Sequence, residues 1–246
     1  MTRALRPDND KGACRRVVYA SSINAVLGYG GVGRDGEASG TAWDVPVWPV
    51  NVYGATKCWG EALARVYSTS YTGPSAGEPA DGPLSCICVR IGSPRWDPEG
   101  RGIPAPVGEP QWGLSSRDCG QLFERCVDVE DLAFAIVPGV SRHAASWMDV
   151  QHTCDVLGYE PLDSTTVVTS LPPAAVLVGC VRPREIGKTR VLVTGASGLV
   201  GGILRIEWGN RYELRLADIK PIEEGKSSSK LPLQTHEEFW LLDTSD

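Results

Sequence analysis

The chain has 246 residues, with 30 acidic and 24 basic side chains and a formal net charge of −6. This length is enough for one sizeable α/β domain, and an acidic chain without a basic stripe argues against a nucleic-acid partner. No apolar run reaches membrane-spanning length, and the first residues lack the apolar core of a secretory signal. We therefore expect a soluble, cytoplasmic protein that binds neither nucleic acid nor membrane.

The eight cysteines are scattered and show neither Cys-x-x-Cys nor histidine-rich metal spacing. Cys86 and Cys88 lie two residues apart in an apparent strand, so they share one face. Buried thiols are therefore favoured over a disulfide or a metal site. No metal is expected.

In chain order, the first predicted element is a short β-branched strand over residues 16–20, which ends at Ser21 and Ser22. This pattern is typical of a buried parallel strand that opens into a loop. The loop runs to about residue 50 and is rich in glycine, as expected of a flexible surface loop.

A helix is predicted over residues 51–71, because apolar residues recur at helical spacing at Trp59, Leu63, Val66 and Tyr67. Tyr53 and Lys57 are four apart, which puts both side chains on one face near the start of the helix. A lysine ammonium one turn away favours the phenolate, so the pair could take a proton from an alcohol. The alternative is an ordinary surface helix in which a solvated Lys57 pairs with Glu61.

Residues 72–83 are turn formers, and residues 84–91 predict a second buried strand. Residues 93–113 carry many prolines and glycines without periodicity, which indicates a loop on the substrate side. Apolar positions at helical intervals then predict a helix over residues 114–136, and residues 147–161 predict another.

A β-branched strand over residues 189–194 leads into a glycine-rich turn and a helix start, with glycines at Gly195, Gly198 and Gly201. Such glycines allow a tight turn and a close backbone approach, so that helix-end amides can hold a pyrophosphate. A second strand closes with Asp218, 23 residues after Gly195. A carboxylate there accepts hydrogen bonds from a ribose 2′-hydroxyl and repels a 2′-phosphate, which favours NAD over NADP.

Several segments in this order resemble one family: Tyr19-Ala-Ser-Ser22, Leu27-Gly-Tyr29, Tyr53-Gly-Ala-Thr-Lys57 and Val89-Arg-Ile-Gly-Ser93. They are similar to the extended short-chain dehydrogenase/reductase superfamily (NAD-dependent epimerase/dehydratase proteins), and most closely to its uronate dehydrogenase-like members. The resemblance implies an α/β, Rossmann-type fold with a doubly wound parallel sheet. It also implies an NAD-dependent oxidoreductase, which in uronate dehydrogenases oxidises the C1 hydroxyl of a hexuronic acid to an aldarolactone.

The resemblance further implies a role for each matching residue. Tyr53 is the general base, and Lys57 supports it and holds the nicotinamide ribose. Ser22 hydrogen-bonds the reacting oxygen, with Ser21 as the fallback. The implied substrate contacts are Ser22, Asn24 and Ser93. The implied cofactor contacts are Gly195, Ser197, Gly198, Leu199, Gly201, Asp218 and Asp243, together with Tyr53 and Lys57. The family also suggests a homodimer through the helix that carries Tyr53 and Lys57, and a glycine-rich loop that covers the active site.

One departure from the family concerns the substrate carboxylate. Uronate dehydrogenases grip it with an arginine, and the best register places Trp112 at that position. The nearby arginines are Arg95, Arg101 and Arg117, and each is interpreted as a solvated side chain rather than a functional one. Ile23 also looks inserted between the serine pair and Asn24.

The two halves of the family fold stand in swapped order. Residues 1–163 match the C-terminal, catalytic half, residues 164–188 form a proline-containing linker, and residues 189–246 match a truncated N-terminal dinucleotide-binding half. A third strand over residues 238–243 carries the adenine-side Asp243. The family's fourth strand and the helix after it cannot be found, so the fold is permuted or fused, and incomplete.

Two explanations fit this order: a circularly permuted domain with a deletion, or the tail of one copy fused to the truncated head of a second. The linker favours the second explanation, and a fragmentary gene product agrees with it equally well. Without the fourth strand, three arrangements of the sheet are reasonable. Residues 174–178 take the place of the missing strand, the strands over residues 16–20 and 190–194 pair directly with each other, or the two halves stay apart. We expect direct pairing or separation. A catalytically inactive relative that at most binds nucleotide is therefore the second function class.

Overall fold

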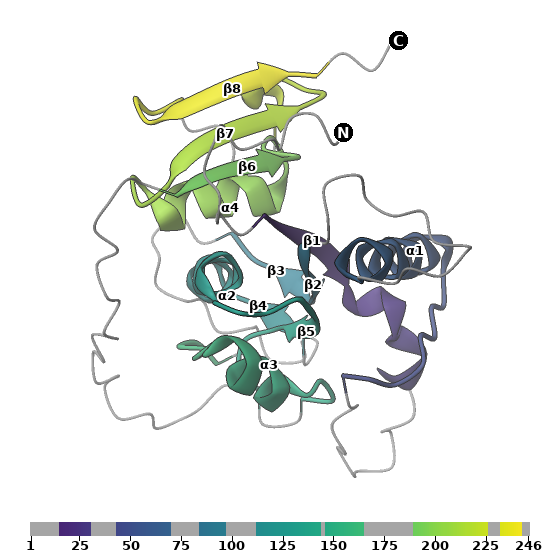
Figure 1. Cartoon of the computed structure of the whole chain (residues 1–246). Coiled ribbons are helices and arrows are strands. Elements are labelled where there is room, and N and C mark those ends of the chain that lie inside the picture. Colours follow the sequence, from purple (N-terminus) through teal and green to yellow (C-terminus); the bar gives the residue numbers. More distant parts are fainter. Residues whose placement is uncertain are drawn as a thin grey trace. The chain divides into compact units, whose positions relative to one another are not determined.

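The computed structural model describes residues 15–30, 43–69, 84–96, 112–143, 146–164, 189–225 and 232–242. They form an α/β architecture with two three-stranded parallel sheets (Figure 1). The chain divides into two compact units that do not follow chain order. The first contains Met1–Ser93, Leu122–Val140 and Ala144–Pro161, and the second contains Pro94–Gln121, Ser141–His143 and Leu162–Asp246.

The sheet of the first unit has the strand order β1 (Arg16–Ser22), β2 (Ser85–Ile91), β5 (Phe134–Gly139), and all its strands are parallel. Every residue of the central strand β2 is buried, which is why its sequence reads as a nearly continuous apolar run. The strands predicted over residues 16–20 and 84–91 are confirmed. β1 is two residues longer than predicted and includes both serines.

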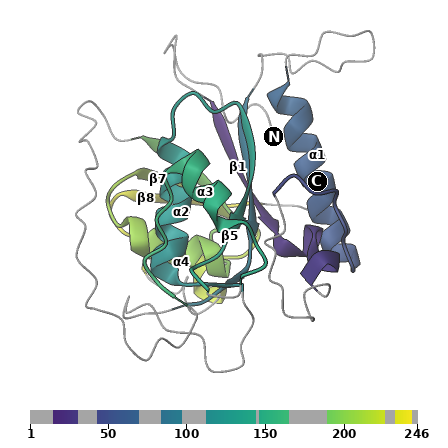
Figure 2. The ribbon, with the colours of Figure 1, turned by 90° about the horizontal axis from the view of Figure 1, so that it is seen from below.

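Helices cover both faces of this sheet. α1 (Val52–Ser68) lies on one face and α3 (Val150–Leu157) on the other (Figure 2). Cys86 and Cys88 pack with α1 in one apolar cluster, and both are free thiols, so the prediction of buried thiols is confirmed for this pair.

Both of these helices are delimited by local signals. Asn51 caps α1 by accepting a hydrogen bond from the Gly54 amide at 2.7 Å. Asp149 caps α3 in the same way, and Gly158 ends it in the left-handed conformation with φ 64°. The predicted helices are confirmed, with shorter bounds: the one expected over 147–161 has only eight helical residues.

The helix predicted over residues 114–136 is wrong in its last part. α2 (Ser116–Asp128) ends early, and β5 begins at Phe134. Val129–Leu132 connects α2 to β5, with Asp131 in the left-handed region at φ 53°. A short apolar run does not distinguish a buried strand from a helix, and here pairing with β2 decides for the strand.

Arg16 helps to fix the end of α2. Its guanidinium donates to the carbonyl oxygens of Cys126 and Val127 at 3.2 and 3.1 Å, and also to that of Val129. Carbonyls at a helix C-terminus have no partner within the helix, so a cation there satisfies them. This contact ties the start of β1 to the connection before β5.

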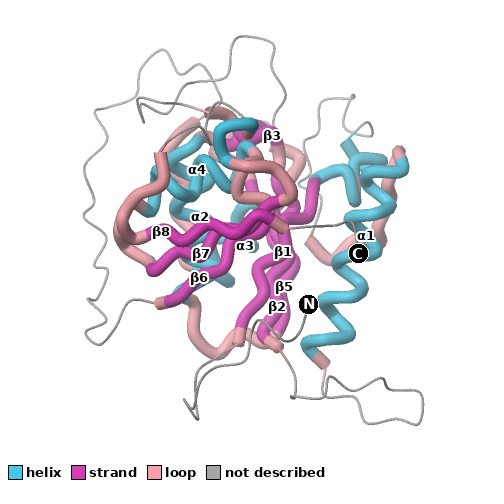
Figure 3. Tube along the Cα trace, turned by 90° about the horizontal axis from the view of Figure 1, so that it is seen from above, coloured by secondary structure: helices cyan, strands magenta, loops and turns pink. Residues whose placement is uncertain are grey.

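The sheet of the second unit has the order β6 (Arg190–Thr194), β7 (Glu213–Asp218), β8 (Glu237–Leu241), again all parallel (Figure 3). α4 (Leu199–Trp208) packs against one face of it (Figure 1). The predicted strands and the helix after the glycine-rich turn are confirmed. Asp243 lies outside the described residues, as do Arg101 and most of the glycine-rich loop before residue 43.

Three short elements complete the description. β3 (Ser93–Pro94) and β4 (Gly113–Leu114) form a two-residue ladder in a region expected to be all loop. η4 (Ile222–Glu224) follows β7.

The described strands of the two three-stranded sheets are not joined by any ladder, so β1 and β6 are each the edge of their own sheet. The expectation of direct pairing or separation of these two strands stays a prediction. Residues 174–178, the third alternative, lie outside the described residues. The assignment of residues 1–163, 164–188 and 189–246 to parts of the family fold stays a prediction.

Candidate active site

The first part of the site is the carboxyl end of β1, where the chain turns into η2 (Ile23–Ala25). Ser22 caps this turn: its Oγ accepts hydrogen bonds from the backbone amide of Asn24 at 3.2 Å and from Asn24 Nδ2 at 3.0 Å. A serine hydroxyl offers two acceptor lone pairs and one proton. With both lone pairs engaged by Asn24, Ser22 Oγ retains its proton for donation.

Asn51 connects this turn to the helix that follows. While its Oδ1 caps α1, its Nδ2 donates to Asn24 Oδ1 at 2.9 Å. One side chain therefore joins the start of α1 to the residue that holds Ser22. The sequence analysis did not single out Asn51, although an asparagine directly before a helix is a recognisable N-cap signal.

Tyr53 and Lys57 lie on the first turns of α1, as their spacing predicts. Lys57 Nζ donates to the carbonyl oxygen of Ala20 at 2.8 Å and lies 5.3 Å from the centre of the Tyr53 ring. It lies at a similar distance, 5.2 Å, from the Tyr19 ring. The ammonium is thus fixed against the strand that ends in Ser22. The Tyr53 side chain is half exposed and accessible to a substrate.

The alternative interpretation, a solvated Lys57 paired with Glu61, does not match the structure. Glu61 is buried and binds Arg90 and Ser21 instead. The two serines at the end of β1 therefore have different partners. Ser21 Oγ donates to Glu61 Oε1 at 2.7 Å, whereas Ser22 lies at the turn and binds Asn24.

Tyr19 is a second phenol beside Lys57. Burial raises its pKa above the ordinary value of 10, and nearby Cys88 and Glu61 raise it further. Tyr19 therefore remains a neutral phenol at neutral pH.

The three predicted substrate contacts, Ser22, Asn24 and Ser93, all lie in the first unit. Ser93 begins β3 and is half-buried, as is Trp112. Arg117 forms an ion pair with Asp163 while its side chain stays 40% exposed, and its interpretation as a solvated rather than a functional side chain stays a prediction. Arg95 extends the β3–β4 ladder by donating its amide to the Leu114 carbonyl at 2.9 Å.

A buried carboxylate that the sequence analysis did not single out lies in the second unit. Asp118, on the first turn of α2, accepts hydrogen bonds from Ser141 Oγ at 2.6 Å and from the Leu162 amide at 2.7 Å. Burial raises its pKa to about 6, and the neighbouring Asp163 also raises it, against the lowering effect of these hydrogen bonds. Asp118 joins α2 to two chain segments that are distant in sequence.

The glycine-rich turn in the second unit is built from backbone contacts. Gly195 has φ 72°, and its amide donates to the Ala217 carbonyl at 2.9 Å. A Cβ atom at Gly201 would lie only 2.7 Å from Ala196 Cα, so the helix and the turn approach too closely for any other residue. Gly198 caps α4 without a side-chain hydrogen bond. A glycine-rich turn at a helix start is the arrangement that cradles phosphates.

Asp218 lies at the carboxyl end of β7, beside this turn. Its Oδ2 accepts a hydrogen bond from the Ser197 amide at 2.8 Å, and Ser197 Oγ donates to the Lys220 carbonyl at 2.8 Å. The structure therefore brings together the predicted cofactor residues of this half that it describes: Gly195, Ser197, Gly198, Leu199, Gly201 and Asp218. Ligands of open α/β sheets bind outside the carboxyl ends of the strands, which is where this group lies.

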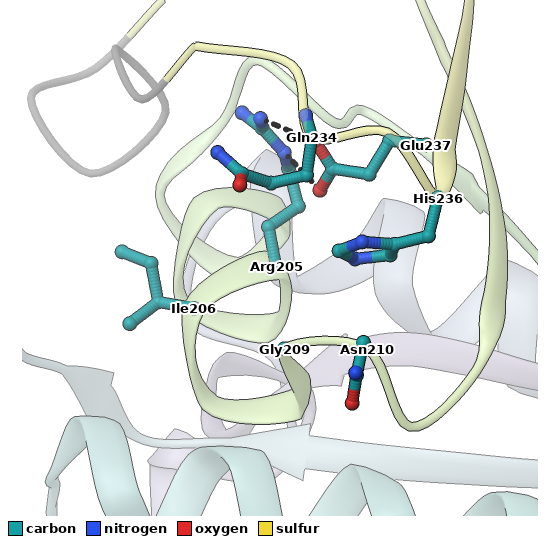
Figure 4. Close-up of a pocket in the computed structure, with 7 residues that line it drawn as sticks. All are labelled: Arg205, Ile206, Gly209, Asn210, Gln234, His236 and Glu237. Atoms are coloured by element: carbon teal, nitrogen blue, oxygen red, sulfur yellow. Dashed lines mark hydrogen bonds and ion pairs between the residues drawn. The ribbon is translucent and has the colours of Figure 1, made fainter.

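A different cavity of about 490 Å³ lies at the other end of α4 (Figure 4). It is lined by Arg205, Ile206, Gly209, Asn210, Gln234, His236 and Glu237. These residues lie in the last turns of α4, directly after α4, or between Gln234 and the start of β8, whereas the glycine-rich turn precedes α4. This cavity is therefore distinct from the predicted dinucleotide site.

Within the described ranges, no cluster of His, Cys, Asp and Glu residues is arranged to hold a metal ion. None of the helices described is long and apolar enough to cross a membrane.

Comparison with known proteins found no matching family model. In sequence, the chain is 32% identical over 121 residues to the NAD-dependent glucose-6-phosphate dehydrogenase of Haloferax volcanii, covering 49% of this chain and 40% of that protein. It is 31% identical over 149 residues to the uronate dehydrogenase of Agrobacterium fabrum, covering 61% and 47%. The chain thus spans less than half the length of these two curated relatives.

Solved structures of a uronate dehydrogenase and a glucuronic acid dehydrogenase also match this chain, at lower sequence identity. A uronate dehydrogenase from Agrobacterium tumefaciens matches with a TM-score of 0.43 and 26% identity, covering 66% of this chain and 55% of that one. A glucuronic acid dehydrogenase from Chromohalobacter salexigens matches with a TM-score of 0.44 and 24% identity, covering 65% and 54%.

The parallel sheets, their flanking helices and the glycine-rich turn define a Rossmann-like α/β protein. Within this class, the chain is similar to the uronate dehydrogenase-like members of the short-chain dehydrogenase/reductase and epimerase/dehydratase family, at low identity and over part of their length. The resemblance stated from the motifs is confirmed at this level.

Proposed function

We propose that this chain is an NAD-dependent oxidoreductase acting on a CH–OH group of a sugar or sugar acid. The observation that carries the proposal is the ammonium of Lys57, fixed on the Ala20 carbonyl beside the Tyr53 ring and on the strand that ends at Ser22. The names of the sequence relatives, NAD-dependent glucose-6-phosphate dehydrogenase and uronate dehydrogenase, support this class.

The proposed chemistry follows from the side chains. Tyr53 accepts the proton of the substrate hydroxyl while the carbon loses a hydride, and the Lys57 ammonium lies 5.3 Å from the centre of the Tyr53 ring. Ser22 donates a hydrogen bond to the same oxygen, whose negative charge grows as the proton leaves. NAD, when bound, is the hydride acceptor.

The preference for NAD rests on Asp218. Its carboxylate offers acceptors for a ribose 2′-hydroxyl and repels a 2′-phosphate. Arg215, the nearest candidate to attract such a phosphate along β7, already lies 3.6 Å from Glu238 and over the Trp240 ring. Titration with both cofactors tests this preference, and tighter binding of NADP would contradict it.

The substrate is proposed to be a hexuronate. Turnover of the purified chain with NAD is measured by NADH absorbance for galacturonate, glucuronate, glucose 6-phosphate and neutral aldoses. Faster turnover of the uronates supports the proposal. Oxidation of neutral sugars alone would indicate that Trp112, in place of an arginine, has removed recognition of the carboxylate.

A second candidate is a catalytically inactive relative that at most binds nucleotide. It is favoured by the sequence, in which the family's fourth strand and the helix after it cannot be found. Calorimetric binding of NAD without turnover of any of these sugars would support this candidate over the dehydrogenase. If NAD binding is absent as well, the dinucleotide site itself is contradicted.

We further propose that α1 mediates a homodimer. Its outer face exposes Val52, Trp59 and Val66, spaced seven residues apart, with Trp59 69% exposed. A continuous apolar stripe on a helix indicates a contact surface. Sedimentation should show a dimer for the parent and a monomer for Trp59→Glu. A monomeric parent would contradict this part of the proposal.

A further inference from the structure

The inner face of α1 carries a buried carboxylate, Glu61, one turn beyond Lys57. Glu61 follows Tyr53 and Lys57 at four-residue intervals and is buried against the sheet. Arg90 on the central strand β2 binds it with both forks of its guanidinium, at 2.9 Å to each carboxylate oxygen. The two side chains are only 4% exposed.

The Glu61–Arg90 pair also contacts β1, which carries Ser22, and the segment that precedes α1. Glu61 Oε1 also accepts the hydroxyl proton of Ser21, the neighbour of Ser22 on β1, at 2.7 Å. The third arm of Arg90 donates to the Trp43 carbonyl at 3.2 Å, in the segment that precedes α1. The Trp43 ring in turn stacks on the ring of His152 on α3, with 4.4 Å between the centres and 8° between the planes.

We propose that Glu61 and Arg90 are positioning residues that set the register of α1 against β1. Because the guanidinium fork and the carboxylate are planar, two parallel hydrogen bonds fix both distance and orientation. Helix α1 is thereby held so that Tyr53 and Lys57 stand opposite the end of β1. The catalytic meaning of this register rests on the proposed function, whereas the register itself does not.

Helix α1 packs closely against β1 and the turn after it, so its position along the strand has to be accurate. A Cβ atom at Gly54 would lie 2.3 Å from the Asn24 carbonyl oxygen, and one at Gly60 would lie 2.3 Å from the Tyr19 ring. Since α1 touches the strand and its loop at both of these points, a small slide changes the place of Tyr53 relative to Ser22. Misplacement by about 1 Å can cost on the order of 100-fold in rate.

The test removes the pair without leaving a buried charge, in the double variant Glu61→Leu/Arg90→Met. The chain offers a matched control in Arg205 and Glu237, a second bidentate pair with side chains 2% and 0% exposed, in the other unit. Both double variants are checked for folding by circular dichroism and thermal unfolding. We expect kcat to fall about 100-fold in the first, with the sugar KM little changed, and to stay within about threefold in Arg205→Met/Glu237→Leu.

A second readout does not depend on activity. Cys58 lies on α1 with its Sγ 3.7 Å from the Ala25 carbonyl oxygen. Burial and Glu61 raise the pKa of this thiol and Arg90 lowers it, so the alkylation rate is measured across pH and compared for the ionised thiolate; it then reports how tightly α1 sits on the strand and loop. Alkylation should be several-fold faster in Glu61→Leu/Arg90→Met and unchanged in the control pair. Cys58→Ser versions of each protein give the background from other thiols. If the double variant does not fold, Ser21→Ala cuts the link to β1 while leaving the ion pair, and the same acceleration is expected.

The outcomes separate the two proposals. A parent without dehydrogenase activity contradicts the proposed function, while the alkylation rate still decides the register. A folded variant that retains either the parental kcat of an active enzyme or the parental alkylation rate of Cys58 contradicts the positioning role of Glu61 and Arg90.

Discussion

The two units of this protein hold a helix on a three-stranded sheet with the same kind of ion pair, but their candidate sites consist of different chemical groups. In each, a helix is bound to a three-stranded parallel sheet by a buried Arg–Glu pair: Arg90 with Glu61 in the first, Arg205 with Glu237 in the second. The first unit, however, presents side chains at the end of β1, whereas the second presents the backbone of a glycine-rich turn.

This difference predicts which substitutions each candidate site can tolerate. In the first unit, Ser22, Asn24 and Asn51 form a chain of side-chain hydrogen bonds, so the chemistry of each group matters. In the second, Gly195 and Gly201 matter because they have no side chain. We therefore expect loss of a polar group to damage the first site, and an added carbon atom to damage the second.

The largest expected effect comes from removing the proton acceptor. Tyr53→Phe keeps the ring beside Lys57 and removes only the hydroxyl, so kcat should fall on the order of 10²–10⁴-fold. NAD affinity, measured by calorimetry, should be retained because the glycine-rich turn is untouched. Activity within about tenfold of the parent would sink the assignment of Tyr53 as the base.

The next effect concerns a buried carboxylate without a cation of its own. Glu61 is bound by Arg90, whereas Asp118 accepts hydrogen bonds from neutral donors. Burial raises the pKa of Asp118 from 3.8 to about 6. Folding therefore favours its protonated form, and this contribution is complete below pH 3.8 and lost as pH rises through about 6. The loss corresponds to about 3 kcal/mol.

Chemical unfolding from acidic to neutral pH measures this contribution. The parent should lose more stability over this range than Asp118→Asn, whose side chain does not titrate. Equal pH dependence of the two proteins would show that folding does not raise the pKa of Asp118.

A smaller effect is expected from one added methyl group in each unit. Gly201→Ala forces a Cβ against Ala196 and should cost about 1–3 kcal/mol, with NAD affinity reduced by about tenfold or more. Gly54→Ala forces a Cβ against the Asn24 carbonyl and should lower kcat while sparing NAD affinity. If both variants change NAD affinity equally, the division between the two sites is wrong.

The smallest effect separates the two roles of Asn51. Asn51→Ala removes the cap of α1 and should cost about 1 kcal/mol of stability. Asn51→Asp keeps the cap acceptor and so the stability, but it cannot donate to Asn24 Oδ1. Both variants should lower kcat, and thermal unfolding should detect only the first. Full activity of Asn51→Asp would show that the bond to Asn24 does not support Ser22.

Periodicity predicted most elements of both sheets because their signals are local. The β-branched runs at residues 16–20, 84–91 and 189–194 are strands, and Asn51 and Gly158 mark helix ends at the expected kinds of residue. The strand β5 was missed, since an apolar run is ambiguous until its partner is known. Only the ladder with β2 shows that Phe134–Gly139 is extended.

The sequence by itself determined the kind of site: the spacing of Tyr53 and Lys57 on one helix face, and the glycines that precede α4. Both follow from the geometry of a single element, which the local chain dictates. The tertiary structure alone decided which serine stands at the turn, that Glu61 binds Arg90 rather than Lys57, and that β1 and β6 belong to separate sheets. These depend on contacts between residues far apart in the chain, which burial and hydrogen-bond satisfaction select only when the elements pack.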